Sequence, residues 1–584
     1  MIEPHTPIPQ PPSDTPPAPP AFQLDELLRG PAAILVAILL LAAVTLALQA
    51  TSGAWRGEFG GHPDEAAHYV TSLMMRDYVF GGGFPQNPMK FAQNYYNHYP
   101  RVALGHYPPG FYLMTAPWMA IFGTSTYSIM GFMALLSTML ALSGFLMARR
   151  RWDFLTALLA GAGVAVLPLT QRYTSLVMSD LALGLFCLAG AWAFGRFVAT
   201  GKLRWSVAFG LLASCAAMIK GSGLMMALVP PAVILLAWRW DVLLNWRLWV
   251  APPIVGILVV PWTKMTYAMA NEGMQPWTPD YPVRSISFLL GQLRLELGWA
   301  LLATTILGLV FILRPLFLPR TAEGEKRGLA PDDASMVAFP LCLLAFYTIV
   351  PSGFDERYLL PAVPACLVLT AWGIQSLAHL LAPRRPRTTM IAGALATVVA
   401  IVFFALTFRV PDKNFHGFHQ VAEVVHGEFG DRLKSGSKER LEVLISSDAN
   451  GEGAFIAEMA QMDRHRPTYT VQRASKMLAS SDWLGRGYKT TFSDAPSLAT
   501  GLRNSQVTWI VRDEESIKAK LGPHHILLGQ ALELPSQGSA AGIPPTGFSL
   551  VQQSFSITRK YHKAPTPLLL YRRVGGKLTT GPSE

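Results

Sequence analysis

Long apolar runs fill most of the first 410 residues, and they constrain the fold more than any other feature. The run at residues 31–50 is typical, and an α-helix of roughly 20 apolar residues is long enough to cross a bilayer. Only 15% of the 584 residues are charged, whereas about a quarter are charged in a typical soluble protein. The chain is therefore predicted to be mainly α-helical and to lie largely within a membrane.

Apolar runs of spanning or near-spanning length predict a polytopic bundle of about 11 transmembrane helices. They are residues 31–50, 124–148, 153–169, 180–199, 205–219, 222–238, 248–263, 298–319, 334–351, 359–382 and 389–408. Lys and Arg cluster in every second connection, near residues 150, 203, 243, 323 and 386, which is typical of connections that face the cytoplasm. The N-terminus is therefore expected in the cytoplasm. The alternate connections, residues 51–123, 170–179, 264–297, 352–358 and the region of residue 220, are expected on the outer side.

Three parts are expected along the chain. Residues 1–28 are rich in proline and predict a disordered cytoplasmic tail. Residues 29–410 form the transmembrane domain, with a large first outward loop at 51–123. Residues 411–584 have ordinary soluble composition with strand-like runs, which predicts an extracytoplasmic α/β domain.

Charge and cysteine content exclude two other classes of protein. The net charge is +11, but the basic residues lie in short clusters between apolar runs, so they set membrane orientation rather than form a nucleic-acid-binding face. The four cysteines lie inside apolar runs without metal-ligand spacing. Neither disulfides nor a cysteine-built zinc site is expected.

The first outward loop contains two adjacent carboxylates, Asp64 and Glu65, just after the first apolar helix. Neighbouring carboxylates near a bilayer repel each other, so the pKa of one of them should rise unless a cation or hydrogen bond compensates. A carboxylate of this kind is suited to general base catalysis. Helix capping explains the same pair equally well, because negative charge is favoured in the first turn of a helix.

Isolated cations occur at the outward ends of apolar helices, where orientation gives no reason for them. Arg172, Lys220 and Arg357 are such residues, and Asp180 and the Asp355-Glu356 pair lie near them in the sequence. An ionisable residue in this position is a candidate functional residue. The alternative is that each cation extends to lipid headgroups. Together with Asp64, the three cations favour an outward phosphate-binding cavity that contains an acidic base.

A pair of prolines in the same loop follows His106 and Tyr107 and precedes an apolar stretch too short to span. Paired prolines cannot continue a helix, so the chain should bend there and re-enter the membrane interface. The bend is expected to bring His106 and Tyr107 toward the cavity that contains Asp64. A simple interfacial anchor would have the same sequence.

These features, taken in order, resemble the membrane glycosyltransferases of the GT-C fold, and most closely the group of protein O-mannosyltransferases and aminoarabinose lipid A transferases. The resemblance covers roughly residues 31–410 and rests on Asp64-Glu65 followed by Tyr69, the Pro108-Pro109 turn, Arg172 with Asp180, Lys220-Gly221, and Arg357-Tyr358 with the prolines after them.

The resemblance implies an inverting transferase of the bacterial inner membrane. Its sugar donor would be linked to a polyprenyl phosphate, and its acceptor would be an envelope glycan, lipid or protein on the periplasmic side, among membrane lipids and without nucleic acid. By position, Asp64 would be the catalytic carboxylate and Glu65 its support. Lys220, Arg357 and Arg172 would bind the donor phosphate, and the substrate cavity would include His68, Tyr69, His106, Tyr107, Asp180 and Tyr358.

No cofactor is expected to be required, because fixed Lys and Arg groups can stabilise a departing phosphate. A divalent metal is the alternative, since Glu65 and His68 lie on one helical face and further histidines occur in the same loop.

Related lipid A transferases tend to have a lysine before the paired prolines where this chain has His106-Tyr107. Phosphate contact at this turn is therefore not implied.

The C-terminal domain contains an acidic, glycine-bearing stretch at residues 447–453, after a strand-like run at 441–446. Ligands often bind where a strand leads into a helix, but a simple connection and helix cap has the same sequence.

Two other functions share a membrane scaffold. A transporter or lipid-glycan flippase should show matched broken helices in two halves and charges near helix middles, whereas here the charges lie at outward ends. A glycan polymerase or ligase that uses a lipid pyrophosphate donor would differ only in its donor.

Overall fold

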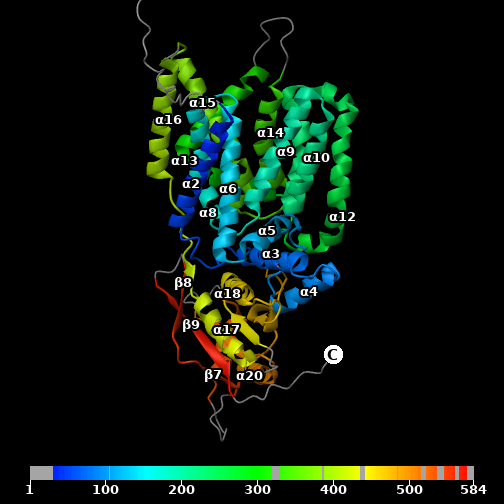
Figure 1. Cartoon of the computed structure of the whole chain (residues 1–584), viewed down its shortest axis with the longest axis vertical. Helices are drawn as coiled ribbons and strands as arrows, with labels where there is room; N and C mark the ends of the chain where they lie inside the picture. Colours follow the sequence, from blue (N-terminus) through cyan, green and yellow to red (C-terminus); the bar gives the residue numbers. More distant parts are fainter. Residues whose placement is uncertain are drawn as a thin grey trace, which may run out of the picture.

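The computed structural model describes residues 30–103, 105–317, 328–384, 387–434, 441–482, 485–514, 521–535, 545–559 and 564–574. The predicted tail at residues 1–28 and parts of the cationic connections near residues 323 and 386 lie outside these ranges. Within them, a bundle of helices stands on a smaller domain that contains a β-sheet (Figure 1).

The bundle and its loops are helical. Their α-helices are α2 (Pro31–Thr51), α3 (Glu65–Phe80), α4 (Pro88–His98), α5 (Gly110–Phe122), α6 (Thr126–Arg149), α7 (Phe154–Val166), α8 (Pro168–Thr174), α9 (Asp180–Thr200), α10 (Leu203–Ile219), α11 (Val229–Ala237), α12 (Ala251–Glu272), α13 (Tyr281–Leu313), α14 (Pro331–Ile349), α15 (Val363–Leu381) and α16 (Arg387–Leu406). Five 3₁₀ helices connect them: η1 (Gly221–Leu228), η2 (Trp240–Leu244), η3 (Trp246–Val250), η4 (Arg314–Leu316) and η5 (Glu356–Ala362).

Eight helical segments among the described residues are long and apolar enough to cross a membrane, and the bent pair α7 and α8 makes a ninth. Helix α10 and the continuous segment of η1 and α11 are apolar but shorter. The chain is a multi-pass membrane protein, and the predicted fold class, a polytopic helical bundle with a C-terminal α/β domain, is confirmed. The count of about 11 crossings stays a prediction.

Two of the predicted helices have different bounds because of proline and glycine. The predicted helix at 153–169 ends at Val166, because Pro168 lacks an N–H and starts α8 at an angle of 62° to α7. Helix α13 begins at Tyr281 rather than at residue 298, and it bends at Gly298, whose φ is 67°. The expected outward connection at 264–297 is therefore mostly helical. Charged residues interrupt the first half of α13, so a search of the sequence for apolar runs detected only its second half.

The first outward loop folds into α3, α4 and α5, which lie between the bundle and the C-terminal domain (Figure 1). Helix α4 begins at Pro88, and the Asn87 side chain accepts the N–H groups of Met89 and Lys90. The paired prolines lead into α5, which has 13 residues and is too short to span a bilayer, as the sequence predicts.

The C-terminal domain has a mixed β-sheet covered by helices. Its elements are β1 (Phe415–His416), α17 (Phe418–Lys434), β2 (Glu442–Ser446), α18 (Ala449–Met462), β3 (Thr470–Arg473), α19 (Ala474–Met477), β4 (Ala479–Ser480), β5 (Lys489–Thr490), α20 (Ala495–Asn504), β6 (Trp509–Asp513), α21 (Pro523–Leu532), β7 (Phe548–Leu550), β8 (Phe555–Arg559) and β9 (Thr566–Arg573). The strand order is β1-β8-β9-β6-β2-β3, with β7 beside β9, and β4 pairs with β5 separately. Strand β2 is parallel to both β3 and β6, whereas the pairs formed by β8 and β9 are antiparallel.

The stretch at 447–453 is a helix cap and the first turns of α18. Asp448 precedes the helix, and its carboxylate accepts the N–H of Gly451 at 2.7 Å. Helix α18 packs against α3, so this end of the parallel strands faces the membrane domain.

Two buried carboxylates join the first outward loop to the chain after α16. Glu65 Oε1 lies 2.7 Å from Lys413 Nζ, and the two side chains are 0% and 2% exposed. Glu58 accepts the backbone N–H groups of Gly417, Phe418 and His419 at the start of α17, where a helix favours negative charge. The C-terminal domain is therefore attached to the membrane domain by contacts as well as by the chain itself.

Lys413→Met should lower the free energy of unfolding by about 3–5 kcal/mol, because breaking a buried ion pair leaves the Glu65 charge without a partner. The measurement is the apparent Tm of the full chain in detergent. The double variant Glu65→Gln/Lys413→Met should recover most of the loss, since neither charge then remains. A double variant no more stable than Lys413→Met would argue against this pair as the cause.

Candidate active site

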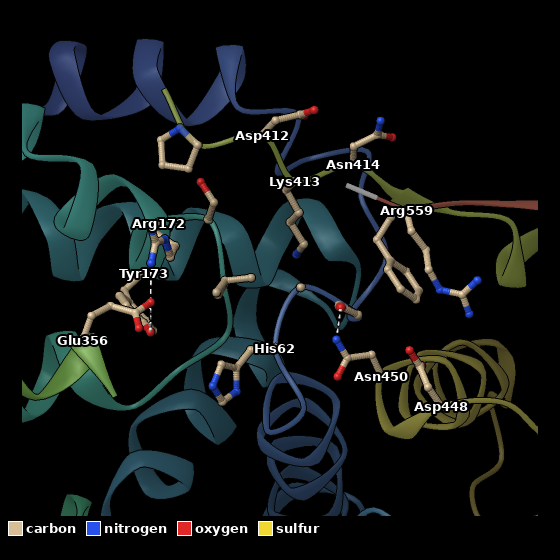
Figure 2. A pocket seen from close by; sticks show the side chains of 16 residues that line it. His62, Arg172, Tyr173, Glu356, Asp412, Lys413, Asn414, Asp448, Asn450 and Arg559 are labelled. Atoms are coloured by element: carbon tan, nitrogen blue, oxygen red, sulfur yellow. Dashed lines mark hydrogen bonds and ion pairs between the residues drawn. The ribbon is translucent and has the colours of Figure 1, made fainter. Parts of the chain in front are cut away.

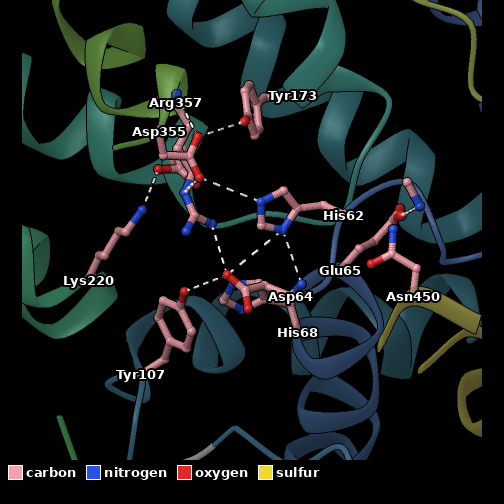
Figure 3. A network of polar contacts seen from close by, with 12 residues as sticks. His62, Asp64, Glu65, His68, Tyr107, Tyr173, Lys220, Asp355, Arg357 and Asn450 are labelled. Atoms are coloured by element: carbon pink, nitrogen blue, oxygen red, sulfur yellow. Dashed lines mark hydrogen bonds and ion pairs between the residues drawn. The ribbon is translucent and has the colours of Figure 1, made fainter. Parts of the chain in front are cut away.

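Asp64 lies immediately before α3, at the end of the bundle that meets the C-terminal domain. Its Oδ2 accepts a hydrogen bond from the Tyr107 hydroxyl at 2.9 Å and lies 3.1 Å from Nη1 of Arg357 (Figure 3). Tyr107 comes from the turn before α5, and Arg357 comes from η5. Three segments that are distant in the sequence thus meet at one carboxylate.

The charges around Asp64 keep its carboxylate ionised. Burial alone raises the pKa of the Asp64 carboxyl. Attraction to the Arg357 guanidinium outweighs burial and holds this pKa well below its ordinary range, and His62 and His68 add to the attraction when their rings are protonated. The adjacent Glu65 does not share this environment, so the expected repulsion between the two carboxylates is avoided.

His62 and Asp355 complete the contacts around Arg357. Asp355 Oδ2 lies 2.9 Å from Arg357 Nε. The Nδ1 atom of His62 accepts the backbone N–H of Asp64 at 3.1 Å. The proton of a neutral His62 ring is therefore on Nε2. This Nε2 atom lies 3.6 Å from Asp355 Oδ2. Burial raises the pKa of Asp355, but His62 and Arg357 lower it below its ordinary range. These four residues and Tyr107 form what we call the Asp64 cluster.

Lys220 lies beside this cluster, at the break between α10 and η1. Its Nζ is 2.7 Å from Oδ1 of Asp180 at the start of α9, and the two side chains are only 9% and 1% exposed. The Lys220 ammonium is 5.4 Å from the centre of the Tyr358 ring, and the Arg357 guanidinium is 5.9 Å from the same ring. Two buried cations therefore flank one aromatic residue.

Arg172 of α8 pairs with Glu356, one of the carboxylates that lie near the candidate cations in the sequence. A longer contact of 3.9 Å joins Arg172 to Glu296. Glu356 is the residue between Asp355 and Arg357, so the Arg172 pair lies directly next to the Asp64 cluster.

His68 lies within α3 behind Asp64. Its Nδ1 is 3.1 Å from the Tyr112 hydroxyl, and its ring centre is 4.6 Å from that of Tyr107. Burial lowers the pKa of His68 to about 4, so the ring is neutral at pH 7.

The remaining predicted residues lie apart from Asp64. Tyr69 donates its hydroxyl hydrogen to the carbonyl of Thr124 at 2.5 Å and is fully buried. His106 interacts with the backbone of Met269. Glu65 points away from the Asp64 cluster toward its buried partner Lys413 (Figure 3).

A cavity of about 340 Å³ lies beside the Asp64 cluster, where the membrane domain meets the C-terminal domain (Figure 2). We call it the junction cavity. Residues of the first loop, of α8 and η5, of the linker at 411–415 and of the C-terminal domain line it. The polar ones are His62, Arg172, Tyr173, Ser175, Glu356, Asp412, Lys413, Asn414, Asp448, Asn450 and Arg559.

Across the residues that the structure describes, no three His, Cys, Asp or Glu side chains are grouped so as to hold a metal ion. Glu65 and His68, the pair that suggested a metal, face different partners. Glu65 contacts Lys413, whereas His68 contacts Tyr112. The geometry does not support that pair as ligands, and the expectation that no metal is required stays a prediction.

Comparison with known proteins identifies this arrangement of helices. The family model described as dolichyl-phosphate-mannose-protein mannosyltransferase matches residues 106–264, which include Tyr107, Arg172, Asp180 and Lys220. Comparison with curated protein sequences found no match.

Three solved structures of similar fold cover most of the chain. ArnT from Cupriavidus metallidurans in the apo state has a TM-score of 0.52 at 13% identity, over 93% of this chain and 98% of ArnT. The same protein bound to undecaprenyl phosphate has a TM-score of 0.51 at 13% identity, over 94% and 99%. The oligosaccharyltransferase of Archaeoglobus fulgidus in the apo form has a TM-score of 0.50 at 13% identity, over 83% and 70%. This chain has the GT-C glycosyltransferase fold. The resemblance noted in the sequence is thereby confirmed.

Within this GT-C chain, sequence reasoning missed several residues of the site. His62 was not predicted as a site residue, and Asp355 was noted only as a carboxylate near the cations; each lies two positions before a predicted residue, and a turn brings it back to that residue. Proximity in the sequence was the available signal. The linker at 411–415 had none, because only the packing of the C-terminal domain brings it to the junction cavity, whereas Asp448 and Asn450 belong to the stretch at 447–453 that the sequence offered as a possible binding site.

Arg357→Met should destabilise the protein at pH 8 by about 3–5 kcal/mol, because it removes the cation from two buried carboxylates. In the wild type the lowered pKa of Asp64 gives a stabilising contribution that is complete above about pH 3.9 and constant from pH 5 to 8. In the variant, burial without the cation should raise the pKa of the Asp64 carboxyl. The free energy of unfolding then falls as the pH rises through that raised pKa. The difference in apparent Tm between wild type and variant should therefore be larger at pH 8 than at pH 5.

Arg284→Met is the matched control for this experiment, because Arg284 and its partner Asp280 are both 61% exposed. It should change the apparent Tm little at either pH. If the difference caused by Arg357→Met stays constant or grows at pH 5, another cation compensates the two carboxylates.

Proposed function

We propose that this protein is an inverting glycosyltransferase. It moves a sugar from a polyprenyl-phosphate-linked donor to an envelope acceptor on the periplasmic side of a bacterial inner membrane. The observation that carries the proposal is the Asp64 carboxylate, which is ionised and held between the Tyr107 hydroxyl and Arg357 at the end of a GT-C bundle. The undecaprenyl phosphate bound in the ArnT structure supports a polyprenyl phosphate as the carrier.

In the proposed reaction an acceptor hydroxyl oxygen attacks the anomeric carbon on the side opposite to the carrier phosphate. The new carbon–oxygen bond forms while the bond to the phosphate oxygen breaks, and the phosphate leaves with the bonding electrons. Inversion follows from this geometry. Asp64 orients the hydroxyl as a hydrogen-bond acceptor and takes its proton. Because its pKa is low, it accepts the proton only when bond formation has made the hydroxyl strongly acidic.

Arg357 and Lys220 are the proposed partners of the carrier phosphate. They are the two buried cations that flank Tyr358, and negative charge grows on the phosphate as the sugar leaves. Fixed donors in a site that excludes water stabilise such charge, and removal of one typically costs about 10²–10³-fold in rate. Arg172 and Asp180 are proposed to shape the same region through their pairs with Glu356 and Lys220.

Glu65 is proposed to support Asp64 indirectly. Its carboxylate accepts the N–H of Gly61 at 2.9 Å and pairs with Lys413, so it fixes both ends of the loop that carries His62 and Asp64. This role differs from a direct contact with the reacting groups.

Asp64→Asn should lower sugar transfer by about 10²–10⁴-fold, the usual contribution of a positioned base. Gene deletion followed by mass spectrometry of envelope glycans identifies the missing sugar, and complementation with each variant then measures transfer. Asp280→Asn, which changes an exposed carboxylate, should restore the glycan fully. Near-normal transfer by Asp64→Asn would remove Asp64 from the catalytic role.

Lys220→Ala should weaken carrier binding by about 10–100-fold, because a hydrogen bond to a charged group contributes about 1.5–3 kcal/mol. The readout is the thermal stabilisation of the purified full chain by undecaprenyl phosphate. Lys202→Ala removes an exposed lysine near the opposite end of α10 and should leave this stabilisation unchanged. Equal stabilisation of Lys220→Ala and the wild type would show that Lys220 does not bind the carrier.

A further inference from the structure

The junction cavity meets the Asp64 cluster at His62. His62 lines the cavity and contacts both Asp64 and Asp355, so it is the residue shared by the cavity and the Asp64 cluster. Lys220 and Arg357 do not line the cavity. A molecule in the cavity would therefore approach Asp64 past His62, whereas Lys220 and Arg357 would bind a carrier phosphate outside the cavity lining.

The cations of the cavity lining are already neutralised. Among the residues that the structure describes there, Arg172 pairs with Glu356, Lys413 with Glu65, and Arg559 with Asp513. Two further carboxylates, Asp412 and Asp448, also line the cavity. An anionic ligand would have to displace a carboxylate from its cation, as it would at Lys220 and Arg357, and in this cavity it would also meet the negative charge of Asp412 and Asp448.

The remaining polar groups of the lining suit hydroxyl groups. Asn450 donates its amide hydrogen to the carbonyl of Gly60 at 3.1 Å, which leaves its carbonyl oxygen as an acceptor. One oxygen of Asp448 caps α18 and the other is a further acceptor. Asn414 lines the same wall and brings both an amide donor and a carbonyl acceptor. Hydroxyl groups, which both donate and accept, match such a set without requiring a charge.

We propose that the junction cavity binds the acceptor of the transferase reaction, and that this acceptor is an uncharged, hydroxyl-bearing saccharide rather than a phosphorylated lipid. The proposal rests on the proposed function, because it assigns the second substrate of the same site. A volume of about 340 Å³ lies within the range of roughly 300–1,000 Å³ that is usual for small-molecule sites. The acceptor hydroxyl would pass His62 to reach Asp64.

Filling the cavity tests the proposal. Asn414→Trp places an indole in the cavity from the linker, and Asp412→Trp is a second variant from the same wall in case the first does not fold. Both should lower sugar transfer at least tenfold in the complemented deletion strain. The stabilisation of the purified full chain by undecaprenyl phosphate should stay at the wild-type value for each of them. Asp280→Trp introduces the same side chain at an exposed position outside the cavity lining and should behave as the wild type in both measurements.

The outcomes separate this proposal from the proposed function. If a folded tryptophan variant transfers sugar at the wild-type rate, or loses stabilisation by undecaprenyl phosphate, the cavity is not the acceptor site. The same mass spectra identify the acceptor, and a modified residue that carries phosphate or carboxylate overturns the proposed acceptor class. If the deletion strain and Asp64→Asn show no change in envelope glycans, the proposed function itself has failed.

Discussion

The ion pairs of Arg357 with Asp64 and Asp355 are the interaction on which the rest of the site depends. A single guanidinium, itself almost buried, holds in the ionised state two carboxylates that are nearly 300 positions apart in the sequence. Without that cation, burial would favour their neutral forms, and the loop before α3 would lose its attachment to η5. The proposed catalytic chemistry and the folding of this end of the bundle therefore depend on the same charge.

The sequence predicted the parts of this structure that follow from composition and local pattern. Apolar runs located the bundle, the paired prolines located the short helix α5, and lone ionisable residues at helix ends identified Asp64, Lys220 and Arg357 as candidates. Their pairing could not be predicted in the same way. Arg172 and Asp180 are close in the sequence, yet each pairs with a residue brought near by helix packing. The beginning of α13 was missed because Arg284, Arg294 and Glu296 interrupt its hydropathy.

The arrangement of charges separates two kinds of surface near Asp64. On the side of the bundle, Lys220 and Arg357 lie close enough to share the ring of Tyr358, and an anion there would reduce the repulsion between them. The cations of both surfaces are paired with carboxylates, but on the side of the C-terminal domain Asp412 and Asp448 add further negative charge to the junction cavity. In the proposed reaction, His62, which contacts Asp64 and lines the junction cavity, would connect the carboxylate to the acceptor.

The linker after α16 becomes part of both domains at once. The Lys413 N–H donates to the carbonyl of Ser52, the N–H of Glu58 donates to the carbonyl of Phe415, and β1 then forms an edge of the C-terminal sheet by pairing with β8. Backbone hydrogen bonds therefore fix the boundary between the two domains, and it does not form a hinge. A chimera that exchanges the C-terminal domain with that of another GT-C protein would have to carry residues 52–65 with it, because residues of this loop and of the linker together form the contacts between the domains.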